Sequence, residues 1–224
     1  MALILCIESA TKNCSVALFK NGTLVSKKEV VSAQNSHAEQ LNIFIIDVLV
    51  DTKIKMQQLD AIAISKGPGS YTGLRIGVST AKGLCFALEK PLIAVPTLQS
   101  MAFTMAQKED ADLFCPMIDA RRMEVYSVFY DAQNKEIRKV QADVVDASIY
   151  ADFLENKVLF FGDGALKCKA IINNKNARFI EGIYPSATDM GILSLNKFQN
   201  NDFEDVAYFE PFYLKDFVAG KKNI

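Results

Sequence analysis

The residues of this sequence that are best suited to chemistry form a glycine-rich segment, Lys66-Gly67-Pro68-Gly69-Ser70, which follows a short apolar run. A turn of this kind between a strand and a helix presents backbone N–H groups that can face an anion. The same residues also suit a tight turn that only closes the sheet, because Gly67 and Gly69 permit close backbone packing. The sequence leaves both interpretations open.

Two shorter turns carry an acid at the end of a predicted strand, Glu8-Ser9-Ala10-Thr11 and Asp119-Ala120-Arg121. They resemble the Asp-x-Gly turns that hold phosphates in actin-like kinases and ATPases. Ala10 and Arg121 replace the glycines of those turns, and a side chain there penalises close approach of the backbone to a ligand. We therefore predict that remnants of nucleotide or phosphate turns are formed by Glu8, Thr11, Asp119, Gly67 and Gly69.

The histidine and cysteine pattern does not predict a metal site. His37 is the only histidine, and the five cysteines are scattered without zinc-ligand spacing. We expect reduced cysteines, and His37 at the surface where a helix starts. A serine peptidase would have to pair Ser70 with His37, but Ser70 is better suited to cap the following helix.

The composition is that of a compact globular protein, with half of the residues apolar and 23% charged. A mean hydropathy of +0.11 favours apolar surface that a protein partner covers. The formal net charge of −1 provides no basic field, so we expect nucleic acid to be bound only through a partner. No signal peptide or membrane-spanning stretch is expected, which favours a cytoplasmic protein.

The predicted elements follow the order strand, strand, strand, helix, strand, helix, strand, which is typical of an actin-like, ribonuclease-H-like lobe. Strands are predicted over 2–8, 14–20, 23–31, 59–65 and 91–95, and helices over 36–51, 72–88 and 97–107, the first capped by Ser36. A weaker copy follows, with strands over 113–119, 123–130 and 157–161 and helices near 187–199 and 212–219. We thus predict a two-lobed α/β fold, each lobe a mixed sheet flanked by helices. The lobes span 1–108 and 109–224, with room for the last helix to pack back on the first lobe.

The helices over 36–51 and 72–88 are apolar on more than one side. In the first, Leu41 and Ile45 share a face with Val48, whereas other apolar residues point away from it. A surface helix needs one apolar stripe, so a second face predicts burial against a partner, with burial inside this chain as the alternative. The predicted partner interface consists of Ile43, Ile46, Val50, Gly73, Ile76, Thr80 and Gly83.

The longest motif, KGPGSYTGLRIG over 66–77, resembles the signature shared by TsaB (YeaZ) proteins and their catalytic relatives, the TsaD transferases. The segments PMIDARRMEVY over 116–126 and PFYLK over 211–215 add to this resemblance, which is strongest over residues 1–130. TsaD transferases place two metal-binding histidines four residues apart at the start of a helix. Here His37 is followed by Leu41 at the second position, so the chain resembles the TsaB family rather than the enzyme.

The resemblance implies a non-catalytic activator of a TsaD-type transferase, which forms N6-threonylcarbamoyladenosine in tRNAs that read codons beginning with A. It implies a heterodimer with the TsaD homologue, a TsaE-type ATPase as a further component, a homodimer when alone, and tRNA contact only within the complex. No catalytic residue, metal or required cofactor is expected, and ATP or ADP would bind at the subunit interface.

Two other classes of function are compatible with the residues. An autonomous actin-like ATPase or kinase would use Glu8 and Asp119, but it would lack the glycines of both turns. A homodimeric binding module unrelated to tRNA would carry the same apolar helices.

Overall fold

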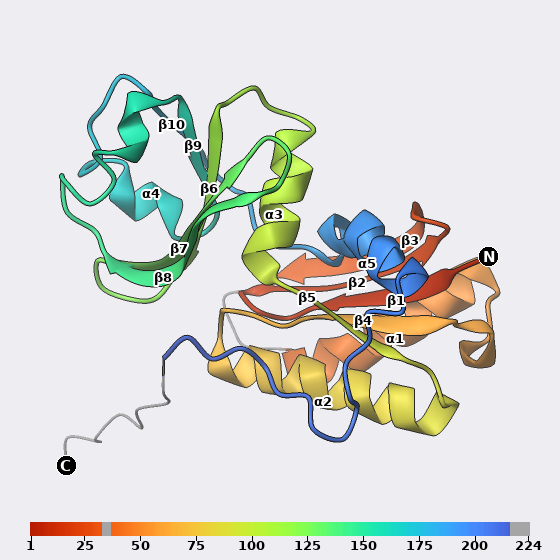
Figure 1. Ribbon diagram of the computed structural model, residues 1–224. Coiled ribbons are helices and arrows are strands. Elements are labelled where there is room, and N and C mark those ends of the chain that lie inside the picture. The colour runs from red at the N-terminus through yellow and green to blue at the C-terminus, as the bar shows by residue number, and fades with distance from the viewer. Residues whose placement is uncertain (33–36, 216–224) are drawn as a thin grey trace, which may run out of the picture.

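The computed structural model describes residues 1–32 and 37–215, and it shows two lobes that are each built on a sheet (Figure 1). The first sheet contains β1 (Leu3–Glu8), β2 (Asn13–Lys20), β3 (Thr23–Val31), β4 (Ala61–Ser65) and β5 (Leu92–Val95). The second contains β6 (Leu113–Asp119), β7 (Glu124–Asp131), β8 (Glu136–Val144), β9 (Val158–Phe161) and β10 (Ala177–Ile180). The helices are α1 (His37–Thr52), α2 (Tyr71–Leu88), α3 (Thr97–Ala106), α4 (Ala165–Cys168) and α5 (Gly191–Gln199), with 3-10 turns η1 (Met56–Gln58), η2 (Phe153–Glu155) and η3 (Ala187–Met190).

Both sheets are mixed, as predicted. The strand orders are β3-β2-β1-β4-β5 and β10-β9-β6-β7-β8. The central strand of the first sheet, β1, pairs antiparallel with β2 and parallel with β4. In the second sheet β6 pairs antiparallel with β7 and parallel with β9, which repeats the arrangement of the first.

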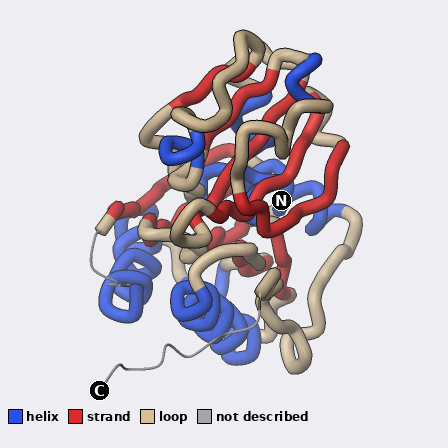
Figure 2. Tube along the Cα trace, turned by 90° about the vertical axis from the view of Figure 1, so that its left-hand side faces the viewer, coloured by secondary structure: helices blue, strands red, loops and turns tan. Residues whose placement is uncertain are grey.

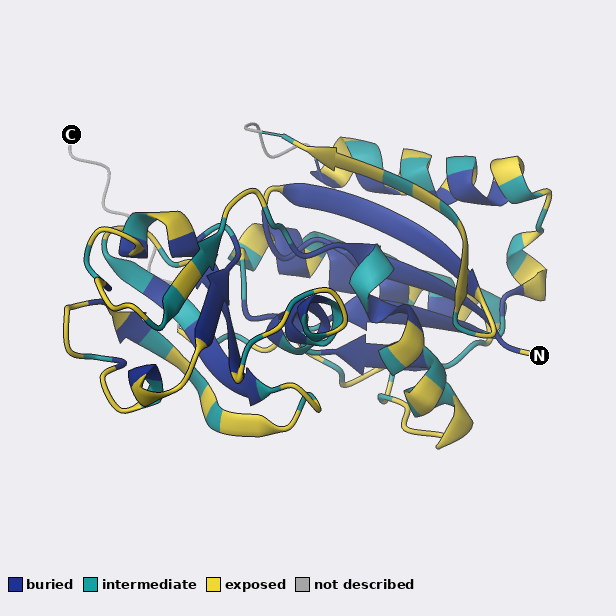
Figure 3. Ribbon diagram, turned by 90° about the horizontal axis from the view of Figure 1, so that it is seen from above, coloured by how far each residue is buried: buried dark blue, intermediate teal, exposed yellow. Residues whose placement is uncertain are grey.

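The first sheet is covered on both faces because alternate side chains of its central strands point in opposite directions. Leu5 and Ile7 pack in a core with residues of α1 and α2, whereas Ile4 and Cys6 pack with η3 on the other face. Figure 3 shows the strands of this sheet buried along most of their length, except for the edge strand β3, which is mostly exposed. Helices α1 and α2 lie side by side on their face (Figures 1 and 2).

The chain returns to the first sheet after it has built the second. The η3 turn and α5 lie against β1 and β5, although residues 109–224 were predicted as one lobe. A strap over residues 203–215 then runs along α2. It is held where Lys82 Nζ donates to the carbonyl oxygens of Ala207 and Phe209, each at 3.0 Å. At the end of the strap, Lys215 pairs with Glu124 of the second sheet.

Several second-lobe elements differ from the prediction. Strands β8 and β10 and helix α4 were not predicted, because β8 carries charged and polar residues along an exposed edge and the other two are short. Residues 212–215 are not helical, which contradicts the start of the helix predicted over 212–219. The rest of that helix and the Ser36 cap lie outside the described residues. No helix among the described residues is long and apolar enough to cross a membrane.

Two glycines of α2 have opposite surroundings and provide a matched test of how this helix packs. A Cβ at Gly73 would lie 2.2 Å from the carbonyl oxygen of Ser9, whereas a Cβ at Gly83 would meet nothing within 4 Å. We expect Gly73→Ala to lower the free energy of unfolding by about 1–3 kcal/mol, because the backbone must move to make room. Gly83→Ala should raise it by up to about 1 kcal/mol, because alanine favours the helix. Urea denaturation of the two variants checks this, and equal effects would contradict the packing described.

Candidate functional site

The first candidate phosphate turn lies at the carboxyl end of β1, where Glu8 is fully buried. Its Oε1 accepts hydrogen bonds from the Ala10 N–H at 2.6 Å and the Ser65 hydroxyl at 2.7 Å. Burial raises the pKa of Glu8 to about 7, although these hydrogen bonds act to lower it. Thr11 is also buried, and its hydroxyl accepts the Asn13 N–H at 3.3 Å. Both predicted residues therefore bond to their own chain.

The glycine-rich turn packs directly on this first turn. The Ser70 N–H donates to the Ala10 carbonyl at 2.7 Å, and a Cβ at Gly69 would lie 2.3 Å from the same oxygen. The Gly67 N–H donates to the Thr97 hydroxyl at 3.2 Å. Since two of the turn's amides bind protein acceptors, the geometry favours the tight-turn interpretation of Gly67 and Gly69 at these positions.

Ser70 caps α2, as the sequence indicated. Its hydroxyl oxygen accepts the Gly73 N–H at 3.2 Å. This bond uses one lone pair of the hydroxyl oxygen. No hydrogen bond between Ser70 and His37, the pair that a peptidase would need, occurs in the described residues.

The second candidate turn is in the other lobe, at the end of β6. The exposed Asp119 carboxylate accepts the Arg121 N–H at 2.8 Å and forms an ion pair with Lys167. The Asp119 N–H donates to Asp163 Oδ1 at 3.1 Å. Burial raises the pKa of Asp163, against that hydrogen bond and the positive charge of Lys12 from the first lobe. The Asp119 carboxylate is thus already paired within its own lobe.

His37 is buried rather than exposed, which corrects the prediction. The helix α1 starts against the end of the first sheet, so its first residue faces the Thr11 backbone. Burial lowers the pKa of His37, and this backbone contact acts in the opposite direction. No group of three or more potential metal-ligating side chains occurs among the described residues.

The outward face of α1 carries three of the predicted interface residues. Ile43 is 51% exposed, Ile46 53% and Val50 67%. Leu41, Ile45, Val48 and Leu49 are buried on the opposite face, as predicted. Beside Ile46 and Val50 lies a hollow of about 390 Å³, whose lining is mainly apolar and includes Leu49, Ile54 and Met56. This is an unpartnered apolar face.

The predicted interface residues on α2 share one side of the helix but differ in burial. Gly83 is exposed, whereas Ile76 and Thr80 are half-buried. Gly73 is buried against Ser9 and cannot reach a partner, so its assignment to the interface is wrong. The sequence interpretation missed Phe86, which is 83% exposed. It lies three residues after Gly83, a helical spacing that could have revealed it.

The sequence and fold were compared with those of known proteins. The TsaB protein of Escherichia coli, named a tRNA threonylcarbamoyladenosine biosynthesis protein, is 30% identical, with 98% of this chain and 97% of the relative covered. The chain belongs to the TsaB family. The related family model of TsaD, described as tRNA N6-adenosine threonylcarbamoyltransferase, matches residues 30–222.

The TsaB-family chain is also similar to a solved structure and to an enzyme. The structure of YeaZ from Pseudomonas aeruginosa superimposes with a TM-score of 0.79 and 26% identity, covering 96% of this chain and all of that chain. A transferase named tRNA N6-adenosine threonylcarbamoyltransferase, from Staphylococcus epidermidis, is 38% identical over 108 residues, or 42% of this chain and 32% of the enzyme. The predicted TsaB resemblance and two-lobed actin-like fold are confirmed.

The buried carboxyl group of Glu8 gives a pH-dependent prediction for this TsaB-family chain. Because the pKa of Glu8 is raised from 4.5 to about 7, the folded state holds a proton that the unfolded state releases between these values. The contribution of Glu8 to stability is therefore present below pH 4.5 and decreases as the pH rises through 7. Replacement by glutamine, which mimics the protonated acid, should leave stability unchanged at pH 4.5 and raise it by about 3 kcal/mol at pH 8.

Urea denaturation of wild type and Glu8→Gln across this pH range measures the difference. Asp189 is present in both proteins, and its charge contributes to the raised pKa of Glu8. A difference that does not depend on pH would show that Glu8 is ionised in the folded protein throughout.

Proposed function

We propose that this TsaB-family chain is a non-catalytic subunit of the machinery that forms N6-threonylcarbamoyladenosine in tRNA, and that it binds a TsaD-type transferase through the outer face of α1 and α2. The observation that carries the proposal is the row of exposed apolar side chains on α1, and Phe86 is a further exposed apolar side chain on α2. We infer the pathway from the name of the E. coli relative, a tRNA threonylcarbamoyladenosine biosynthesis protein.

Covering the exposed apolar side chains of α1 would contribute favourable free energy to binding. Complete burial of an exposed aliphatic side chain contributes about 1.5–3 kcal/mol, so covering the half-exposed Ile43, Ile46 and Val50 would contribute about 3 kcal/mol. An exposed aromatic side chain such as Phe86 is typical of the anchors that dominate binding energy. The adjacent hollow beside Val50 would receive a side chain of the partner.

A TsaD-type partner follows from the relationship between the two families. The TsaD model matches most of this chain, including α1 and α2, so a TsaD protein carries equivalent helices. Two related chains that meet through equivalent helices form a nearly twofold interface, in which each helix contacts its counterpart. The same geometry would join two copies of this chain into a homodimer when the transferase is absent.

The candidate phosphate turns support a non-catalytic role. Glu8 is buried and hydrogen-bonded on β1, Ala10 receives the Ser70 N–H, and Asp119 is paired with Lys167. These groups bond to their own chain, and Asp119, although exposed, is already ion-paired. The net charge of −1 favours tRNA binding by the complex rather than by this chain. An ATPase of the TsaE type, and ATP or ADP at the subunit interface, complete the proposal.

Substitution of Val50 tests the interface, with Val144 as a matched control. Both valines are 67% exposed, but Val50 lies on α1 and Val144 on β8 of the other lobe. We expect Val50→Glu to weaken association with the TsaD homologue by about 100-fold or more, because a charge would be buried in an apolar contact. Val144→Glu should leave association unchanged. Equal binding by both variants, measured by calorimetry on folded proteins, would reject this interface.

Reconstitution tests the non-catalytic role. The chain, the TsaD homologue and the TsaE-type ATPase are mixed with tRNA, ATP and threonylcarbamoyl-adenylate, and each protein is omitted in turn. We expect tRNA modification to depend on the TsaD homologue and to be stimulated by this chain, which alone should not modify tRNA. Metal-dependent ATP hydrolysis by this chain alone, abolished in Glu8→Ala, would identify an autonomous ATPase instead.

A further inference from the structure

The exposed apolar side chains of α1 belong to one row that has opposite charges at its two ends. The row contains Glu39, Ile43, Ile46, Val50 and Lys53, which are separated alternately by four and three residues. This spacing is that of the contact seam between two packed helices. All five residues are exposed. The row begins with an acid in the first turn of the helix and ends with a base directly after the helix.

Neither charged end forms an ion pair within the part of the chain that the structure describes. The neighbouring Asp51, in contrast, is paired with Lys28 of β3. Lys53 has a left-handed backbone with a φ of 57° and lines the hollow beside α1. The helix dipole favours an acid at the start of α1 and a base at its end. It does not require that both charges lie on the exposed row, as Glu39 and Lys53 do.

The row is nearly symmetric about Ile46. Glu39 and Lys53 each lie seven residues from it, or about 10 Å along the helix axis. A twofold axis that passes beside Ile46 would therefore set the acid of one copy against the base of another copy at both ends. Two copies with parallel helices would instead place acid against acid and base against base, which costs free energy. The charges thus favour antiparallel α1 helices.

The hollow at the end of α1 fits the same arrangement. Position 49 mirrors position 43 about Ile46, so Ile43 of a second copy would lie over Leu49. Leu49 lines the hollow of about 390 Å³ together with Ile54 and Met56. An aliphatic side chain suits this lining, because its burial removes apolar surface of both copies from water. The hollow would then receive the side chain that the symmetry brings to it.

We propose that two copies of this chain associate through antiparallel α1 helices, with Glu39 of each copy paired with Lys53 of the other and Ile43 in the hollow. This inference rests on the proposed interface and adds its orientation and its charge pairing. Covering the aliphatic side chains supplies the affinity, since exposed ion pairs contribute little by themselves. The pairs select one orientation of the helices, because the alternative sets like charges together at both ends.

Charge reversal tests the orientation, with the full chain alone and its self-association measured by sedimentation velocity over a range of concentrations. Glu39→Lys and Lys53→Glu should each weaken the dimer about tenfold, because either change turns both attractive pairs into repulsive ones. The double variant restores both pairs and should associate within about threefold of wild type. Lys139→Glu, on the exposed edge strand β8, makes the same change of net charge as Lys53→Glu and should have no effect.

Each alternative arrangement predicts a different result. Parallel helices would leave both single variants unchanged, because like charges would still face like charges. A role in the helix dipole alone would make the double variant weaker than either single variant, since both ends of α1 would then oppose the dipole. Either result, or a wild-type monomer at all concentrations, would overturn the proposal. The Val50→Glu assay uses the TsaD homologue, whereas this one uses the chain alone, so either proposal can fail without the other.

Discussion

The close packing of the glycine-rich turn on the end of β1 is the contact on which the rest of the first lobe depends. The Ser70 N–H binds the Ala10 carbonyl, and neither Gly69 nor Gly73 has room for a Cβ against the turn between β1 and β2. This contact fixes the start of α2 at the carboxyl end of the sheet. Because α1 packs beside α2, it also sets the outer surface that the two helices present together.

The same contact accounts for the tight-turn geometry of the glycine-rich segment. An anion-binding turn needs unoccupied amides and a glycine that permits close approach. In this chain the amides of Gly67 and Ser70 bind Thr97 and Ala10. The Ala10 methyl group then lies against Gly69. These bonded atoms join two segments of one lobe.

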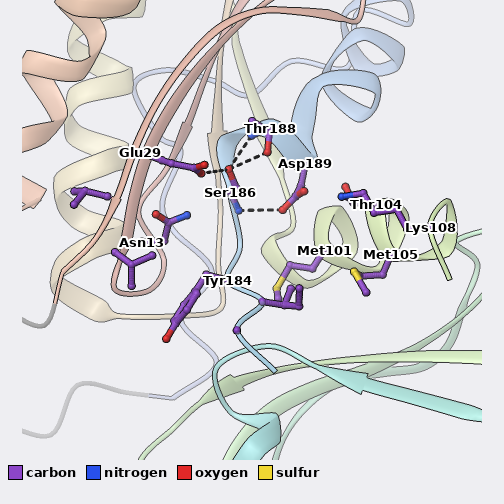
Figure 4. A pocket seen from close by; sticks show the side chains of 14 residues that line it. Asn13, Glu29, Met101, Thr104, Met105, Lys108, Tyr184, Ser186, Thr188 and Asp189 are labelled. Carbon is purple, nitrogen blue, oxygen red and sulfur yellow. Dashed lines mark hydrogen bonds between the residues drawn. The ribbon is translucent and has the colours of Figure 1, made fainter. Parts of the chain in front are cut away.

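The sequence predicted the features that follow from a regular spacing of apolar residues. The 3.6-residue repeat of α1 placed Ile45 inside and Ile46 outside, because one face had to be buried. It could not place Gly73, since a small residue suits a partner helix and the chain's own backbone equally well. His37 was misplaced because its burial depends on where α1 begins relative to the sheet. The cavity lined by Asn13, Met101 and Asp189 (Figure 4) could not be predicted, because its lining comes from separate segments that only the fold brings together.

The strap over 203–215 limits the direction from which a partner can approach. Helix α2 packs on the sheet through Val78 and Ala81, and Lys82 binds the strap's carbonyl groups along another side. Gly83 and Phe86 are exposed on α2, which packs beside α1. In the proposed complex a partner helix would pack closely over Gly83, where no side chain intervenes. The strap closes one flank of α2, so in that proposal the partner approaches from the side of the exposed α1 residues.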